Sequence, residues 1–137
     1  MTKNKKKNKM TCPYCGATAV LRDASYVYGE GAMVDKLYVC SHYPVCDSYV
    51  GVFRNTDYPK GTLANSELRN KRIRTHQLFD AIWKQGIMTR GQTYQWMQHK
   101  FSLTKRQAHI GYFSDYMCEE LMKECKEVLE NNLTKEA

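Results

Sequence analysis

The sequence predicts an α+β protein in which a small module with a three-stranded antiparallel sheet precedes a helical module of about four helices. Three observations predict this order. Short runs of β-branched and aromatic residues, separated by glycine-containing turns, fill the first part of the chain. After them, apolar residues recur every three or four positions, as on one face of a helix. Two pairs of cysteines bracket the first strands.

The 137 residues fit one ordinary domain or two small ones. We expect residues 1–10 to form a disordered basic arm, because they are polar, lysine-rich and without periodicity. The β-rich module spans residues 11–58, the helical module spans residues 59–131, and residues 132–137 form a tail. A mean hydropathy of -0.64 and the lack of a long apolar run exclude a membrane span. No apolar segment follows the basic start, so we expect a cytoplasmic protein.

The strands are expected in three segments. Residues 18–29, TAVLRDASYVYG, and residues 33–39, MVDKLYV, have the β-branched and aromatic residues of strands. GEGA, at residues 29–32, supplies the turn between them. Residues 48–54, SYVGVFR, offer a third strand, and the Pro, Gly and Asn residues of NTDYPKGT, residues 55–62, mark a connector.

The helices are expected after this connector. In residues 63–86 the predicted buried face carries Leu68, Thr75, Phe79 and Ile82, and Gly86 is a natural helix end. Two capping boxes, Thr89-x-x-Gln92 and Thr104-x-x-Gln107, each predict the start of a new helix. We expect Gly111 to end the short helix that the second box opens. Ser114 then starts the last helix, whose predicted buried stripe is Met117, Leu121, Cys125 and Val128.

The two cysteine pairs have the spacing of a metal site. CPYCG contains Cys12 and Cys15, CSHYPVC contains Cys40 and Cys46, and 24 residues separate the pairs. Disulfides are rare in the cytoplasm, where paired cysteines more often bind metal. Zinc accepts four thiolates at the corners of a tetrahedron, and its binding stabilises a sheet too small to fold alone. We therefore predict one structural Zn²⁺ held by these four cysteines, in preference to disulfides or redox thiols.

The remaining histidine and cysteine candidates are not assigned to the metal. His42 lies between Cys40 and Cys46, but four cysteines already complete the shell. A closed shell leaves no position for a catalytic water, so the site is expected to be structural. Cys118 and Cys125 are seven residues apart, hence on one helix face, where we expect small buried apolar residues.

The cysteine motifs resemble a known zinc ribbon. CPYCG followed by YVCSHYPVC resembles the ribbon repeated at the C-terminus of bacterial type IA topoisomerases, which has a C-P-x-C-G knuckle and a C-S-x-Y-P-x-C loop. The matching positions are Cys12, Pro13, Cys15, Gly16, Cys40, Ser41, Tyr43, Pro44 and Cys46. The resemblance implies binding of single-stranded DNA through exposed aromatic and basic side chains. The topoisomerase catalytic domain has no counterpart here, so strand cleavage is not implied.

The wider chain, about residues 11–125, is similar to a zinc-finger-containing domain family of unknown function found in bacteriophages, prophages and their bacterial hosts. The segments that carry this similarity are CDSYVGVF, PKGTLANSELRNKRIRTHQLFDAIW, TRGQTYQWM and AHIGYF.

The net charge of +7 is unevenly distributed, which favours a polyanionic partner for the first two thirds of the chain. Residues 1–10 carry five lysines and no acid, whereas residues 115–137 carry seven acids and three lysines. Aromatic side chains crowd the β-rich module, and such rings beside cations can stack on bases. The candidate nucleic-acid contacts are Tyr26, Tyr28, Tyr38, Tyr43, Lys60, Arg69, Arg72 and Arg74.

Other interpretations of these residues stay open. The rings could instead cover the sheet, since most aromatic side chains are at least partly buried. Arg69, Arg72, His76 and Asp80 lie along one helix, where they are able to contact phosphates, to lock the two modules together or to serve catalysis.

The sequence thus predicts a non-catalytic zinc-ribbon protein that binds nucleic acid, with a preference for single-stranded or distorted DNA. We expect it to be encoded by a phage or prophage. It would act in the host cytoplasm, without a membrane or small-molecule partner. The alternative is a phage inhibitor of a host defence protein or nucleoprotein complex, whose acids mimic phosphates: Asp115, Glu119, Glu120, Glu124, Glu127 and Glu130. A nuclease or nucleic-acid processing factor is the less favoured third class.

Overall fold

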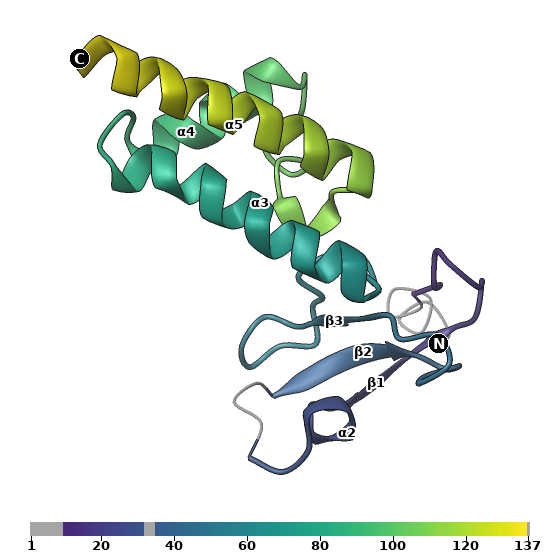
Figure 1. Ribbon diagram of the computed structural model, residues 1–137. Helices are drawn as coiled ribbons and strands as arrows, with labels where there is room; N and C mark the ends of the chain where they lie inside the picture. The colour runs from purple at the N-terminus through teal and green to yellow at the C-terminus, as the bar shows by residue number, and fades with distance from the viewer. Residues whose placement is uncertain (1–9, 32–34, 137) are drawn as a thin grey trace. The chain divides into compact units, whose positions relative to one another are not determined.

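The computed structural model describes residues 10–31 and 35–136 (Figure 1). The predicted basic arm, apart from Met10, and parts of the first turn and second strand lie outside these residues. The chain forms two compact units, Met1–Glu67 and Leu68–Ala137, called here the ribbon unit and the helical unit.

The ribbon unit contains the predicted three-stranded antiparallel sheet. Its strands are β1 (Ala19–Asp23), β2 (Lys36–Cys40) and β3 (Tyr49–Gly51), in the order β1-β2-β3. Ala19 pairs with Cys40 and Leu37 pairs with Gly51. β3 is short. After it, Val52 and Pro59 form an isolated antiparallel bridge. The α+β prediction is confirmed.

The prediction of one strand over residues 18–29 is wrong in its second half. β1 ends at Asp23, and Ser25–Tyr28 form α2, a single helical turn that ends where the Gly29 N–H donates to the Ser25 carbonyl at 2.9 Å. Gly29 has a φ of 82°, which suits a residue without a side chain. The turn buries Ala24 against Leu37 and Val39, so tertiary packing overrides the β propensity of the aromatic residues.

The sheet buries side chains on both faces. Successive side chains of a strand point to opposite faces, so Leu37 and Val39 lie on one side and Tyr38 and Cys40 on the other. Leu37 and Val39 pack with Ala24 and with the half-buried Val27, Tyr43 and Tyr49. Tyr38 and Cys40 pack with Cys12, Ala19, Val52 and Leu63.

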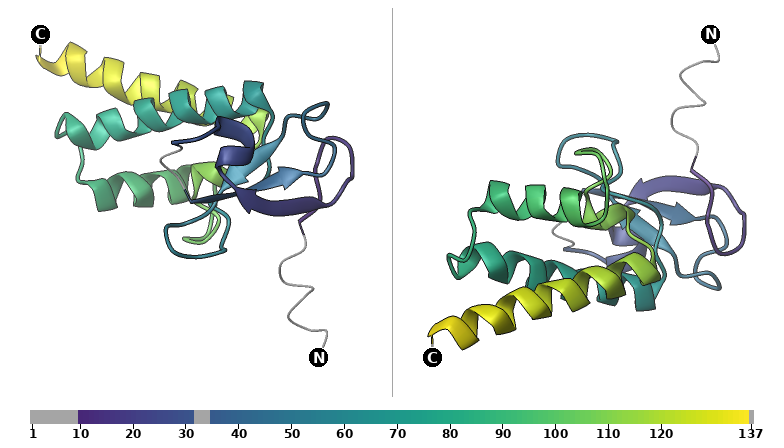
Figure 2. Two further views of the ribbon diagram at one scale, coloured as in Figure 1. Left: turned by 90° about the horizontal axis from the view of Figure 1, so that it is seen from below. Right: turned by 90° about the horizontal axis from the view of Figure 1, so that it is seen from above.

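The described part of the helical unit has three α-helices and one 3₁₀ helix, which agrees with the predicted number of about four helices. These are α3 (Ser66–Lys84), α4 (Arg90–Lys100), η1 (Ile110–Tyr112) and α5 (Asp115–Glu136). The three long helices lie side by side in the views of Figures 1 and 2. The buried residues of α3 are the predicted ones, Leu68, Thr75, Phe79 and Ile82. None of the helices within the described residues is both long and apolar enough to cross a membrane.

The two predicted capping boxes have different outcomes. At Thr89 the box forms and opens α4: the Gln92 N–H donates to Thr89 Oγ1 at 3.1 Å, and the Thr89 N–H donates to Gln92 Oε1 at 2.9 Å. At Thr104 and Gln107 the same two hydrogen bonds form, but the chain makes only a turn. The prediction of a helix there is wrong, because a cap supplies about 1 kcal/mol and cannot propagate a helix without a buried face.

The last helix follows the prediction. Ser114 Oγ accepts a hydrogen bond from the Met117 N–H at 3.2 Å. Leu121 and Cys125 are fully buried, with Cys118 beside them, whereas Met117 and Val128 are half-buried.

Candidate functional site

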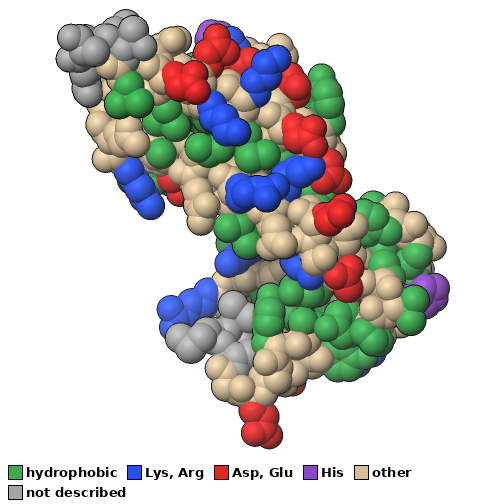
Figure 3. Space-filling view, viewed as in Figure 1, with side chains coloured by type: hydrophobic (Ala, Val, Ile, Leu, Met, Phe, Trp, Pro, Cys, Tyr) green, Lys and Arg blue, Asp and Glu red, His purple; other side chains and the backbone are tan. Residues whose placement is uncertain are grey.

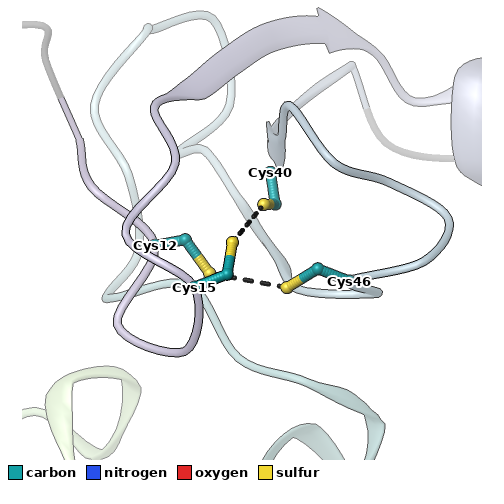
Figure 4. Close-up of side chains that lie close together, drawn as sticks. All are labelled: Cys12, Cys15, Cys40 and Cys46. Carbon is teal, nitrogen blue, oxygen red and sulfur yellow. Dashed lines mark hydrogen bonds between the residues drawn. The ribbon is translucent and has the colours of Figure 1, made fainter.

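The four predicted metal ligands come together in the ribbon unit (Figure 4). Cys12 and Cys15 lie in the turn before β1, Cys40 ends β2, and Cys46 ends the loop that leads to β3. Their four Sγ atoms lie within 4.8 Å of one another. Cys12 Sγ is 3.6 Å from Cys46 Sγ, and Cys15 Sγ is 3.4 Å from Cys40 Sγ.

Local turns aim each pair at the same point. In the first turn the Gly16 N–H donates to the Cys12 carbonyl at 2.9 Å, and Gly16 has a φ of 78°. In the second turn the Tyr43 N–H donates to the Cys40 carbonyl at 2.9 Å, and the Cys46 N–H donates to the His42 carbonyl at 3.1 Å. The pairing of β1 with β2 brings these two turns together.

The cluster fits one Zn²⁺. In a tetrahedral site with Zn–S bonds of about 2.3 Å, neighbouring sulfurs lie about 3.8 Å apart. The observed pairs at 3.4 and 3.6 Å are close to this separation. Four thiolates complete the coordination shell, which leaves no open position for a catalytic water. The geometry therefore suits a structural ion.

Three further groups lie against the sulfurs. Ser48, which is fully buried, has its Oγ 3.1 Å from Cys12 Sγ and 3.5 Å from Cys46 Sγ. The His42 N–H donates to Cys40 Sγ at 3.5 Å, and His42 Nδ1 lies 3.5 Å from Cys15 Sγ. His42 thus lies beside the ligands and is not one of the clustered four. Outer groups of this kind orient ligands and tune the metal.

The surroundings shift the pKa values of two of the thiols in opposite directions. Burial raises the pKa of Cys12, but hydrogen bonds from Ser48 and from the backbone at Cys15 and Tyr14 outweigh it and lower the pKa to about 6. Burial raises the pKa of Cys40 to about 12. A bound divalent cation favours the thiolate of both residues, since coordination removes the thiol proton.

A family comparison agrees with this geometry. The model of a zinc-finger-containing domain family matches residues 8–128, which include all four clustered cysteines. The chain belongs to this family. No curated protein and no solved structure matches the chain. Together, the family and the cluster establish a zinc-finger-containing domain with a site for one zinc ion.

The predicted stacking residues differ in exposure. Tyr26 and Tyr28 are 47% and 54% exposed, and Tyr43 is half-buried. Tyr38 is only 3% exposed, and its hydroxyl donates to the Asp57 carbonyl at 2.8 Å. Burial, followed by the Asp57 carboxylate, raises the pKa of Tyr38. Its ring packs with Cys12, Cys40 and Leu63 in a buried cluster, so the expectation that Tyr38 stacks on bases is corrected here.

The exposed tyrosines belong to a connected set, called here the tyrosine cluster, whose members are Tyr26, Tyr28, Tyr43 and Tyr49. Ring centroids are 5.8 Å apart for Tyr26 and Tyr43, 6.5 Å for Tyr43 and Tyr49, and 5.7 Å for Tyr28 and Tyr49. The guanidinium carbon of Arg22 lies 4.2 Å from the centroid of the Tyr26 ring. The sequence carries no local signal for Arg22, because the turn into α2 that brings it over Tyr26 is not predicted.

The basic residues predicted to contact nucleic acid also differ in their exposure and in their hydrogen bonds. Lys60 and Arg74 are exposed, and Arg69 is half-buried. Arg72 is half-buried, and its Nε and Nη2 donate to the Phe113 carbonyl at 3.1 and 3.0 Å. Arg72 therefore ties α3 to the residue after η1, which is a structural role inside the helical unit.

His76 and Asp80, also singled out from the sequence, form a small polar network on α3. His76 Nδ1 lies 3.3 Å from Asp80 Oδ2, and Trp83 Nε1 donates to Asp80 Oδ1 at 3.1 Å. The carboxylate is thus shared between a histidine and an indole of the same helix, which fits a role in holding these side chains in place.

Proposed function

We propose that this protein is a non-catalytic nucleic-acid-binding protein that contacts single-stranded or distorted DNA through the tyrosine cluster. The observation that carries the proposal is the cluster itself. The exposed rings of Tyr26 and Tyr28 each contact a half-buried ring of the cluster, and the Arg22 guanidinium lies over the ring of Tyr26. Unpaired bases stack on such rings, at about 1–3 kcal/mol per base, whereas bases inside a duplex are already stacked.

The tyrosine cluster favours binding because its side chains are held in place before a ligand binds. Tyr43 and Tyr49 pack on the buried residues Leu37 and Val39, so the rings that they touch lose little freedom on contact. The Arg22 guanidinium beside Tyr26 supplies a cation for the phosphate that follows a stacked base. Figure 3 shows hydrophobic side chains, a class that includes tyrosine, gathered on the visible face of the ribbon unit.

Charge supports nucleic acid over the alternative of phosphate mimicry. The chain carries +7, and Lys60 and Arg74 are exposed. On the helical unit, acidic and basic side chains are interspersed (Figure 3). Lys71 pairs with Asp115 at 3.2 Å and with Glu119 at 2.6 Å. Lys100 likewise pairs with Glu124 at 3.2 Å, so the acids of α5 present a partly neutralised surface.

The proposal extends to origin and place of action. The resemblance of the chain to phage and prophage proteins favours a protein encoded by a phage or prophage that acts in the host cytoplasm. The type IA topoisomerase likeness of the ribbon favours single strands as ligand, without the cleavage chemistry of those enzymes.

Fluorescence anisotropy tests the proposal with labelled 20-nucleotide single-stranded DNA, the matching duplex and single-stranded RNA. We expect the tightest binding to a single strand, and Tyr26→Ala to weaken it by about 5- to 150-fold, equivalent to 1–3 kcal/mol. The matched control is Tyr58→Ala, because Tyr58 is 74% exposed and lies outside the cluster. Absence of binding to every probe at low salt, or an equal effect of both substitutions, would defeat the proposal. Loss of intact probe in the presence of Mg²⁺ would instead support a nuclease.

A further inference from the structure

The four cysteines of the zinc site differ in their exposure to solvent, and the imidazole of His42 lies beside the sulfur of Cys15 at 3.5 Å. Cys12 and Cys40 are each 1% exposed, Cys46 is half-buried, and Cys15 is exposed. Ser48 covers the Cys12 and Cys46 sulfurs from inside the unit. A small oxidant dissolved in water therefore meets the side chain of Cys15 before that of any other ligand.

The exposed residue Cys15 has a buried partner at short range. Cys15 Sγ lies 3.4 Å from Cys40 Sγ, which water does not reach. Formation of a disulfide requires the two sulfurs to approach to about 2 Å, a movement of little more than 1 Å at this site. An attack on Cys15 from outside can thus be followed by an attack from Cys40 on the inner side.

We propose that Cys15 is a peroxide-reactive residue, and that its oxidation yields a Cys15–Cys40 disulfide and releases the zinc ion. This inference is independent of the proposed nucleic-acid binding. It assigns the zinc site a chemistry beyond its structural role, with hydroperoxides as the class of oxidant.

The reaction balances in two steps. The Cys15 thiolate attacks one oxygen of the peroxide, the O–O bond breaks, and hydroxide leaves, which gives a sulfenic acid at Cys15. The Cys40 thiolate then attacks the Cys15 sulfur, the S–O bond breaks, and a second hydroxide leaves as the S–S bond forms. Two thiolates lose two electrons and the peroxide accepts them. Cys12 and Cys46 remain as two ligands, too few to retain the ion.

Cys118 and Cys125 do not compete for the oxidant. Both are fully buried on α5. Burial raises the pKa of both thiols, to about 12 for Cys125, so neither has the thiolate character that peroxide needs. The cysteines of the helical unit therefore serve as an internal reference.

Mass spectrometry of the zinc-loaded full chain after hydrogen peroxide treatment tests the pairing. A Cys15–Cys40 bond joins the tryptic peptides 10–22 and 37–54, and fragmentation distinguishes it from a Cys12–Cys46 bond between the same peptides. A Cys12–Cys15 bond stays within one peptide. We expect the Cys15–Cys40 product, in step with zinc release to a chromogenic chelator. Any other dominant pairing, or oxidation without zinc release, would overturn the proposal.

Two variants test which sulfur reacts first. Cys15→His keeps four zinc ligands but removes the exposed thiolate, so zinc release by peroxide should slow by about tenfold or more. Cys46→His is the matched control, because it also exchanges one sulfur for nitrogen but leaves Cys15 in place. The control should release zinc at a rate within about twofold of the unmodified chain. Equal protection by both variants contradicts the assignment to Cys15. The pairing in the unmodified chain decides the question if a variant fails to bind zinc.

Discussion

The hydroxyl of Ser48 lies 3.1 Å from the sulfur of Cys12, although the two residues are 36 positions apart in the chain. Ser48 is fully buried, and its hydroxyl also lies 3.5 Å from the sulfur of Cys46. A buried hydroxyl needs such a partner, and a zinc-bound thiolate is a good acceptor for its proton. Ser48 therefore couples the first cysteine turn to the start of β3.

Ser48→Ala is expected to weaken zinc binding by about 10- to 100-fold, the usual effect of losing an outer hydrogen bond to a metal ligand. Competition with a chelator of known affinity measures this change. Ser41→Ala serves as the control because Ser41 is exposed and lies in the loop between Cys40 and Cys46. An unchanged affinity for Ser48→Ala would show that the hydroxyl only fills space.

Removal of the metal is expected to unfold residues 11–54 and to spare α4 and α5, because the two buried clusters of the ribbon unit are small and one of them contains Cys12 and Cys40. Hydrogen exchange measured by mass spectrometry, before and after chelation, locates the loss of protection. Cys40→Ser should have the same effect, and elemental analysis of the untreated protein should give one zinc per chain. Retained protection in β1 and β2 after chelation would contradict a folding role for the ion.

Tyr43→Ala separates stacking from packing at the second cysteine loop. The ring of Tyr43 contacts the buried cluster of Ala24, Leu37 and Val39 and lies 5.8 Å from Tyr26. Loss of a half-buried ring should cost about 1–2 kcal/mol in unfolding free energy. If the cluster stacks on bases, the same change should also weaken binding to single-stranded DNA by about 1–3 kcal/mol. A lower melting temperature with unchanged affinity would make Tyr43 a core residue alone.

Arg72 and Arg74 are expected to differ although they lie on the same helix. Arg72→Ala removes two hydrogen bonds to the Phe113 carbonyl and should destabilise the helical unit by about 1.5–3 kcal/mol. Arg74→Ala should leave stability within about 0.5 kcal/mol, because Arg74 is exposed. If Arg74 contacts a phosphate, its loss lowers the salt slope of DNA binding by about one. Urea titration and binding at four salt concentrations measure both quantities, and equal destabilisation by the two variants would contradict the structural role of Arg72.

Tyr38 should make the ribbon unit sensitive to alkaline pH. Burial and the Asp57 carboxylate raise its pKa in the folded protein above the value of an exposed tyrosine, so the neutral phenol is favoured by folding. This contribution is fully present below about pH 10 and is lost as the pH rises through the folded pKa. Tyr38→Phe should lower stability by about 1 kcal/mol at neutral pH, since the bond to the Asp57 carbonyl is lost. Melting curves from pH 8 to 11 should then show a smaller alkaline decline in the variant than in the unmodified chain.

The sequence by itself determined the features that depend on short-range spacing. The buried face of α3 follows from the 3.6-residue period of Leu68, Thr75 and Phe79, and the structure shows these residues buried. The Thr89 capping box needs only residues three positions apart. The four metal ligands could be named because two short turns each aim a pair of thiols, and zinc accepts a narrow set of geometries.

Only the tertiary structure decided which side chains are covered. Alternation along β2 places one of two adjacent residues on each face, but it does not say that Tyr38 meets a covered face. The helical turn of α2, which brings Arg22 over Tyr26, forms because Ala24 packs against Leu37 and Val39 of β2. The Arg72 bond to Phe113 spans 41 residues. These outcomes depend on contacts between segments that are distant in the sequence. The free energies of such contacts exceed local propensities of a few tenths of a kcal/mol, and no local sequence pattern predicts them.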